Sequence, residues 1–141
     1  MTRPGVDARL RRVAAPVAVA AGVAAAGGAL LAYGPDEVVP VRCPFLALTG
    51  LDCPLCGGTR SATALAGGDL SAALDLNAFT TVGLIVVAGL WLTWLVGRWR
   101  DRPSAVSTWT PGNRFWTALT ISAAVFAVLR NLPGPTSALG A

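Results

Sequence analysis

Histidine and lysine are absent from this chain of 141 residues, and charged residues make up only 13% of it. The lack of histidine removes the commonest general base and the commonest metal ligand, which disfavours most hydrolases and any histidine-bearing zinc site. All 11 basic residues are arginines that flank apolar segments, so the formal net charge of +4 does not indicate a nucleic-acid partner. With 54% hydrophobic residues and a mean hydropathy of +0.61, the composition indicates an integral membrane protein.

The first uncharged segment covers residues 13–35 and follows a basic lead at residues 1–12, which we expect to be irregular and cytoplasmic. Its 23 residues exceed the ~20 that a helix needs to cross a hydrocarbon core of about 30 Å, so a transmembrane helix is predicted over Ala14–Tyr33. A cleaved signal peptide is the alternative, because an Ala24-x-Ala26 pattern follows the basic start. The apolar run is, however, longer than the roughly 7–15 residues of a signal core.

Two further apolar segments follow. A second transmembrane helix is predicted over residues 78–97, and the connector 98–114 is expected to be irregular because it holds prolines, glycine, serines and threonines. The third transmembrane helix is predicted over residues 115–132. Its apolar run between Arg114 and Arg130 has only 15 residues, or about 22 Å at 1.5 Å per residue, which is short for a span.

The arginines predict the orientation of these helices. Eight of them lie in the lead 1–12 and the connector 98–114, and three lie elsewhere. The positive-inside rule then predicts a multi-pass protein with its amino terminus in the cytoplasm and with the loop 36–77 and the tail 133–141 on the outer face of the cell membrane. Tryptophans near the ends of the connector are typical of a membrane interface: Trp94, Trp99, Trp109 and Trp116.

The outer loop contains all three cysteines and is the only segment of the sequence with a dense group of residues suited to metal binding or thiol chemistry. Cys53-Pro54-Leu55-Cys56-Gly57 has the spacing of a metal-binding knuckle, in which two thiolates bind one ion and the glycine permits a tight turn. Cys43 adds a third thiol at most, whereas a structural zinc ion needs four ligands. A zinc site on Cys43, Cys53 and Cys56 therefore requires Asp52 or a second subunit to complete it.

Thiol exchange and a structural disulfide are the other interpretations of these cysteines. Exchange is favoured when a helix begins at the first cysteine and lowers its pKa, but Gly57-Gly58 interrupts such a helix. Thr59 is the expected N-cap of a short helix at Arg60–Ala66 instead. On an oxidising outer face, two of the three cysteines are expected to pair and hold the loop, which leaves one thiol over.

Charged residues around the loop predict a polar cluster of Arg60, Asp69, Asp75 and Arg130. Asp69 is expected to cap a second short interfacial helix at Leu70–Leu76, and Arg60 is close enough in sequence to reach Asp69 or Asp75. Arg130 either extends to the interface along its alkyl chain or is buried against Asp69 or Asp75. A partner is expected in the second case, because an arginine at membrane depth costs roughly 2.5–3.5 kcal/mol.

The full pattern reads C-P, then T-G-x-x-C-P-x-C-G-x-T-R, G-D, an alanine pair, asparagine and a final R-N. It resembles the bacterial domain-of-unknown-function family 2752, small integral membrane proteins named for no activity. The resemblance implies a membrane protein and no particular reaction. Asn77 is followed by Ala78 where the family usually has proline, so the second membrane helix is expected to begin with a less sharp turn. The matching positions are Cys43, Pro44, Thr49, Gly50, Cys53, Pro54, Cys56, Gly57, Thr59, Arg60, Gly68, Asp69, Ala72, Ala73, Asn77, Arg130 and Asn131.

These observations predict an all-α integral membrane protein with three transmembrane helices and two short interfacial helices between the first and the second. No complete catalytic constellation is visible, so we expect no enzyme. The leading hypothesis is a non-catalytic accessory or partner-binding subunit whose cysteine loop is structural. The alternative is a thiol redox or metal-binding membrane protein that uses Cys53 and Cys56. The expected partners are the lipid bilayer and another membrane protein.

Overall fold

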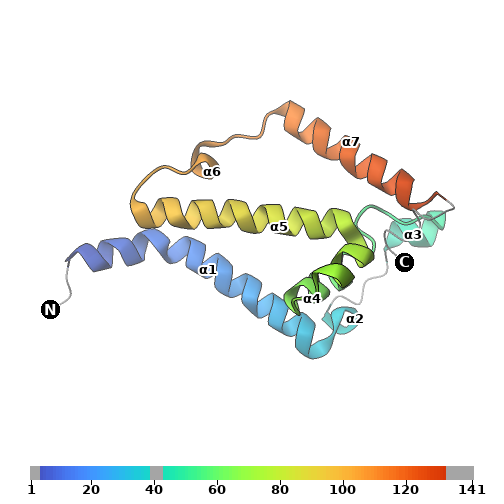
Figure 1. Cartoon of the computed structure of the whole chain (residues 1–141), viewed down its shortest axis with the longest axis horizontal. Helices are drawn as coiled ribbons and strands as arrows, with labels where there is room; N and C mark the ends of the chain where they lie inside the picture. Colours follow the sequence, from blue (N-terminus) through green and yellow to red (C-terminus); the bar gives the residue numbers. More distant parts are fainter. Residues whose placement is uncertain (1–3, 39–42, 133–141) are drawn as a thin grey trace. The chain divides into compact units, whose positions relative to one another are not determined.

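The computed structural model describes residues 4–38 and 43–132 (Figure 1). Every regular element in this part of the chain is a helix, which confirms the all-α prediction. The predicted outer tail at residues 133–141 and the first three residues of the lead lie outside the described residues. The helices are α1 (Pro4–Tyr33), α2 (Pro35–Val38), α3 (Pro44–Thr49), α4 (Gly58–Ala66), α5 (Leu70–Arg100), α6 (Ala105–Thr108) and α7 (Asn113–Arg130).

The chain divides into two compact units. The first contains Met1–Ala26 and Ile85–Thr110, and the second contains Gly27–Leu84 and Pro111–Ala141. Each long helix, α1 and α5, therefore contributes one part to each unit. All three cysteines belong to the second unit.

Helix α1 begins ten residues before the predicted transmembrane helix. The expectation of an irregular lead is therefore wrong for residues 4–12, which are helical. Pro4 occupies the first helical position, where its missing N–H costs nothing, and Asp7 lies in the first turn, where a negative charge is favourable. Hydropathy marks the part of a helix that suits lipid, whereas capping and helix propensity decide where the helix begins.

Prolines also explain helices that were not predicted. Three short helices, α2, α3 and α6, were not predicted, and α2 and α3 begin at Pro35 and Pro44. Proline is favoured at the first position of a helix although it breaks a helix interior. The loop between the first two long helices therefore contains more helix than the two predicted short elements.

Helix α4 matches the predicted short helix, but its cap differs. Gly57 is the N-cap, with φ 76°, and no side chain caps the helix. The prediction of Thr59 as N-cap is thus wrong, because Thr59 already lies inside the first turn. The carbonyl of Thr59 instead accepts a hydrogen bond from the hydroxyl of Thr63 at 3.0 Å.

Helix α5 consists of two helical segments that meet at Asn77. Asn77 has φ −164° and ψ 95°, an extended backbone within an otherwise helical run. The first segment is capped as predicted, because the carboxylate of Asp69 accepts hydrogen bonds from the Ala72 N–H at 2.9 Å and the Ser71 hydroxyl at 2.8 Å. The break lies between the predicted short helix at Leu70–Leu76 and the predicted second membrane helix.

The packing between α4 and α5 uses small and polar side chains. Ser61, Ala73, Asn77 and Thr81 are fully buried. The hydroxyls of Ser61 and Thr81 lie 2.7 Å apart, and the Thr81 hydroxyl also lies 2.7 Å from the Ala73 carbonyl. Small residues allow two helices to approach closely, and the buried hydroxyls of Ser61 and Thr81 both have partners. This contact places the N-terminus of α4 beside the break in α5.

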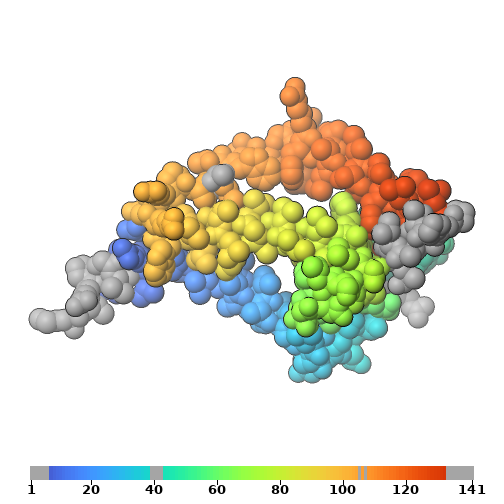
Figure 2. Space-filling view, viewed as in Figure 1, coloured from blue at the N-terminus to red at the C-terminus, as the bar shows by residue number. Residues whose placement is uncertain are grey.

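Two helices among the described residues are long and apolar enough to cross a membrane: Asp7–Tyr33 of α1, and α5. The third predicted span coincides with α7 but is not one of these two. The middle of α5, yellow in Figure 2, lies open on the visible face. Its exposed apolar side chains are Val82, Leu84, Ile85, Val86, Val87, Leu90, Leu92 and Val96. Such a surface suits lipid and supports association with a membrane.

Candidate metal centre

The three cysteines lie around one tight turn of the second unit, residues 53–57, which is called the cysteine turn below. Cys43 directly precedes α3, and the Cys56 N–H donates to the Cys53 carbonyl at 3.0 Å. Gly57 follows in the left-handed conformation, where a Cβ would lie 3.0 Å from the Leu76 carbonyl oxygen. Only glycine meets both conditions without strain. The prediction that Gly57 provides a backbone turn is confirmed.

The sulfur atoms of these residues converge. The Sγ atoms of Cys43 and Cys53 are 3.4 Å apart, those of Cys53 and Cys56 are 3.2 Å apart, and all three lie within 4.8 Å of one another. The cysteines are free thiols in this structure. Two sulfurs bound to one tetrahedral zinc ion at ~2.3 Å would lie about 3.8 Å apart. The three sulfurs therefore approximate one triangular face of a tetrahedral site.

The thiols differ in acidity. Burial raises the pKa of the Cys56 thiol to about 12. Hydrogen bonds from the Leu46 backbone and the Cys53 side chain lower the pKa of the Cys43 thiol. Cys56 therefore lacks the lowered pKa that a nucleophilic thiol needs for exchange at neutral pH. A bound cation would supply the positive charge that stabilises its thiolate.

Asn77 holds the turn from the side of α5. Its side-chain Nδ2 donates to the carbonyls of Pro54 and Cys56 at 3.0 and 2.8 Å. Its Oδ1 accepts from the Thr80 N–H at 2.8 Å. With its extended backbone, Asn77 acts as the N-cap of the second segment of α5 while it orients the segment between the two cysteines.

Arg130 and Asn131 hold the same turn from the end of α7. Arg130 is only 6% exposed, and its Nη1 donates to the Cys56 carbonyl at 2.8 Å. Its Nε lies 3.6 Å from a carboxylate oxygen of Asp52. The side chain of Asn131 donates to the Asp52 carbonyl at 2.8 Å and accepts from the Asp52 N–H at 2.9 Å. The Cys56 carbonyl thus accepts hydrogen bonds from the side chains of Asn77 in α5 and Arg130 in α7.

The predicted polar cluster does not form. Arg60 lies 3.4 Å from Asp36 in an exposed ion pair, and the carboxylate of Asp69 caps α5. Asp75 is exposed and forms no ion pair within the described part of the chain. Arg130 pairs with Asp52, so neither Asp69 nor Asp75 is its partner. The acidic partner of each arginine is therefore determined by the conformation of the folded loop.

Asp52 is likewise not a fourth ligand beside the cysteines. Within residues 4–38 and 43–132, the group of ligand atoms that could hold one ion consists of Cys43, Cys53 and Cys56 only. The carboxylate of Asp52 faces Arg130 instead, and its backbone is bound by Asn131. Of the two ways of completing a zinc site, Asp52 or a second subunit, this conformation does not provide the first.

The sequence interpretation assigned no role to Asn77 or Asn131. Both belong to the pattern of the resemblance, but an asparagine that binds backbone carbonyls and N–H groups leaves no signature in residue type or spacing. The one available signal for Asn77 was its place between the helices predicted at residues 70–76 and 78–97, because asparagine is a favoured N-cap. No comparable signal pointed to Asn131.

Comparison with known proteins gives one family. No curated protein and no solved structure matches the chain. The model of the family described as Protein of unknown function (DUF2752) matches residues 43–91, which include the three cysteines and Asn77. The match covers the cysteine turn, α4 and most of α5, so this part of the chain is similar to that family.

Proposed function

We propose that the protein is a small integral membrane protein whose cysteine turn binds one thiophilic metal ion such as zinc and serves a non-catalytic, partner-binding role. One observation carries the proposal: the sulfurs of Cys43, Cys53 and Cys56 lie within 4.8 Å of one another, although Cys43 is ten residues from Cys53 in the sequence. Thiolates are the ligands preferred by zinc and other soft cations.

The surroundings of the thiols support a metal centre. The carbonyls next to them are held by Asn77, Arg130 and Asn131, so the turn is positioned by three side chains from two helices. Outer contacts of this kind orient metal ligands and raise affinity. Three cysteines would leave the fourth position of a zinc ion to a water molecule or to a side chain of a partner, which connects metal binding with an accessory role.

Helix α7 is proposed as the third membrane-spanning helix. Its 18 residues extend about 27 Å at 1.5 Å per residue, close to a hydrocarbon core of about 30 Å. The charge at its end is no obstacle, because Arg130 contacts Asp52 and the Cys56 carbonyl rather than lipid. The arginine distribution supports an amino terminus in the cytoplasm and the cysteine turn on the outer face of a bacterial cell membrane.

Metal content tests the centre directly. The full chain, purified in mild detergent with reductant, is expected to bind one equivalent of zinc. Cobalt substitution should produce sulfur-to-cobalt charge-transfer absorption. Cys43→Ser, Cys53→Ser and Cys56→Ser should each lower the affinity strongly, whereas Ser104→Ala, a matched small change in the other unit, should not. A protein that binds neither ion in its reduced state would contradict the proposal.

A disulfide is the second candidate, because the sulfur of Cys53 lies within 3.4 Å of both other sulfurs. Intact mass before and after reduction distinguishes the two. A fixed disulfide that forms in cells, together with no bound metal, supports a structural staple or a thiol redox role and excludes the metal centre. Full cellular function in a Cys53→Ser, Cys56→Ser double variant would exclude the metal centre, the structural disulfide and the thiol redox role.

The orientation has a separate test. All three cysteines lie in one loop, so a membrane-impermeant thiol reagent reports on that loop alone. After mild reduction and removal of metal, the reagent should label intact cells. Labelling that requires the membrane to be opened would reverse the proposed orientation without affecting the metal centre.

A further inference from the structure

Helix α3 is apolar and exposed on all sides within the part of the chain that the structure describes. Its sequence, Pro-Phe-Leu-Ala-Leu-Thr, contains no charge, and all six residues are exposed. Leu48 is 86% exposed, and Leu51 and Leu55, which follow the helix, are 48% and 64% exposed. A helix that is hydrophobic all round requires an apolar environment. These residues belong to a segment, 43–57, that is called the α3 segment below.

The backbone of the α3 segment is paired internally although its side chains are exposed. The N–H groups of residues 50–53 all donate to protein atoms. In chain order their acceptors are the Leu46 carbonyl at 2.9 Å, the Thr49 hydroxyl at 3.2 Å, the Asn131 side chain at 2.9 Å and the Cys56 sulfur at 3.3 Å. The Thr49 hydroxyl itself donates to the Phe45 carbonyl at 2.7 Å. Water would satisfy such groups at a protein surface, whereas lipid leaves them dependent on internal partners.

The α3 segment meets the end of α7, where more apolar residues are exposed. Hydrogen bonds of 2.8 and 2.9 Å join the side chain of Asn131 to the backbone of Asp52. Leu129 and Leu132, which lie near Asn131 in the sequence, are 41% and 46% exposed. The single charge of the segment, on Asp52, lies 3.6 Å from the buried Arg130. The segment therefore adds no unbalanced charge to this exposed apolar surface.

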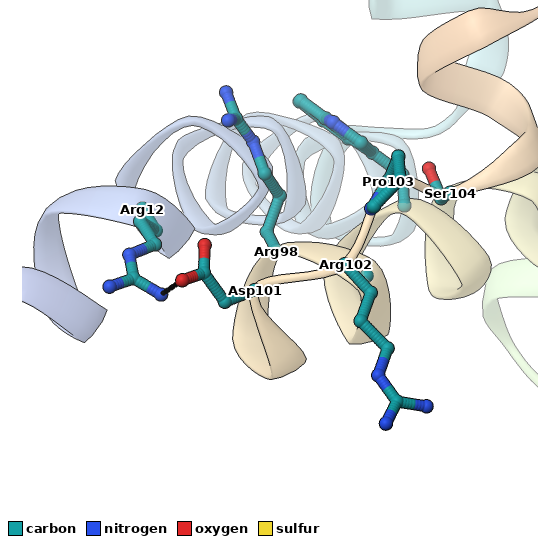
Figure 3. A pocket seen from close by; sticks show the side chains of 8 residues that line it. Arg12, Arg98, Asp101, Arg102, Pro103 and Ser104 are labelled. Atoms are coloured by element: carbon teal, nitrogen blue, oxygen red, sulfur yellow. Dashed lines mark ion pairs between the residues drawn. The ribbon is translucent and has the colours of Figure 1, made fainter.

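The α3 segment also contacts one end of the apolar part of α5. Residues 76–97 carry no charge, and these 22 residues are enough for the ~20 of a membrane-spanning helix. At one end of this part, charged residues line a pocket, among them Asp101, whose carboxylate binds Arg12 at 2.7 Å (Figure 3). At the other end, the side chain of Asn77 donates to two carbonyls of the cysteine turn. The α3 segment therefore lies where α5 enters the proposed membrane span.

We propose that the α3 segment inserts into the lipid leaflet at this end of α5, with Leu48 and Leu55 in contact with phospholipid. The inference rests on the proposed membrane span of α5 and is independent of the metal centre. Lipid fits this surface better than a protein partner, because specific protein interfaces add hydrogen bonds and the N–H groups of residues 50–53 are already paired. The cysteine turn then lies at the boundary between lipid and water.

Photocrosslinking of the full chain tests this contact. The photoreactive residue p-benzoyl-phenylalanine is placed at Leu48, and the protein is reconstituted in vesicles of dioleoylphosphatidylcholine. Illumination should increase the intact mass by that of one phospholipid molecule. The same residue at Glu37, which is exposed in the acidic helix α2, should give no lipid adduct. At Val87, which is 61% exposed within the apolar part of α5, it should give one, and this adduct reports on the membrane span itself.

The outcomes separate the lipid contact from the span. Lipid adducts at Val87 but not at Leu48 would overturn the contact and leave the span intact, whereas adducts at neither position would overturn both. A doubled mass at Leu48, or a crosslink to another protein when illumination is repeated in cell membranes, would overturn lipid as the occupant. Equal adduct yields at Glu37 and Leu48 would show non-specific labelling and overturn the contact. Circular dichroism verifies helicity, and Leu55 carries the same expectation as Leu48 if the Leu48 variant loses it.

Discussion

Replacing Asn77 by alanine should destabilise the protein substantially. The change removes the cap of the second segment of α5, which contributes about 1 kcal/mol. It also removes two hydrogen bonds to the carbonyls of Pro54 and Cys56, each contributing about 1 kcal/mol. The expected loss in the free energy of unfolding is therefore about 3 kcal/mol. For a chain of this size that corresponds to a fall in Tm of about 6–12 °C.

Thermal unfolding followed by circular dichroism, with the full chain in mild detergent, measures this loss. Asn77→Ser keeps an oxygen able to cap the helix but has no amide donor, so it should retain about 1 kcal/mol of the lost stability. Asn113→Ala is the matched control, because Asn113 is exposed and its side chain forms no hydrogen bond with the residues that the structure describes. Equal melting of Asn77→Ala and Asn113→Ala would refute the argument that Asn77 holds the cysteine turn.

Zinc affinity is a second readout of the same substitution. If the proposed centre exists, loss of the Asn77 contacts should lower zinc affinity by about 10–100-fold, as for other residues that orient metal ligands. Unchanged affinity together with a lowered Tm would show that Asn77 stabilises the fold without positioning the thiols.

Three further substitutions follow from the described contacts. Gly57→Ala forces a Cβ into the left-handed region and to 3.0 Å from the Leu76 carbonyl, so a loss of about 1–2 kcal/mol is expected, with a fall in Tm of several degrees. Thr81→Val leaves the buried Ser61 hydroxyl without its 2.7 Å partner and should cost about 1–3 kcal/mol in denaturant unfolding. Hydrogen bonds from the Ala72 backbone and the Ser71 side chain lower the pKa of Asp69, so its contribution to stability is present above the unfolded pKa and is lost as the pH falls through the folded pKa. Asp69→Ala should therefore flatten the acid side of the stability profile.

Each of these substitutions has a control. Gly22→Ala places a Cβ where nothing lies within 4 Å and should not destabilise the helix. Thr117→Val removes an exposed hydroxyl and should change stability by less than about 0.5 kcal/mol. Asp69→Asn keeps the cap without the charge, so it should flatten the profile with less loss near neutral pH. If the Asp69→Ala profile keeps the wild-type acid slope, Asp69 is not the group responsible.

Features set by local sequence were predictable. The Asp69 cap, the turn at Gly57 and the division of α5 near Asn77 all follow from neighbouring residue types. The early start of α1 and the helices at Pro35 and Pro44 were not predicted, although proline is favoured at the first position of a helix. A proline therefore indicates where a helix begins as well as where one ends.

Contacts between distant segments were not predictable in the same way. A buried Arg130 was expected to pair with Asp69 or Asp75, whereas its acidic partner in the structure is Asp52, at the edge of the cysteine turn. Side chains that bind backbone carbonyls, as Asn131 does at Asp52, recognise a conformation and not a residue type. The meeting of Cys43 with Cys53 and Cys56 likewise depends on where α3 lies.

The contacts of Arg130 and Asn131 with the cysteine turn have a consequence for biosynthesis. They join residues 74 to 79 positions apart, so the turn leaves the ribosome long before the side chains that hold it. During that interval the three cysteines are synthesised, with Asn77 soon after them, but the end of α7 does not yet exist. The turn can therefore be completed only after α7 has been synthesised, and a chain that stops before α7 would carry every thiol without the arginine and asparagine that hold their loop.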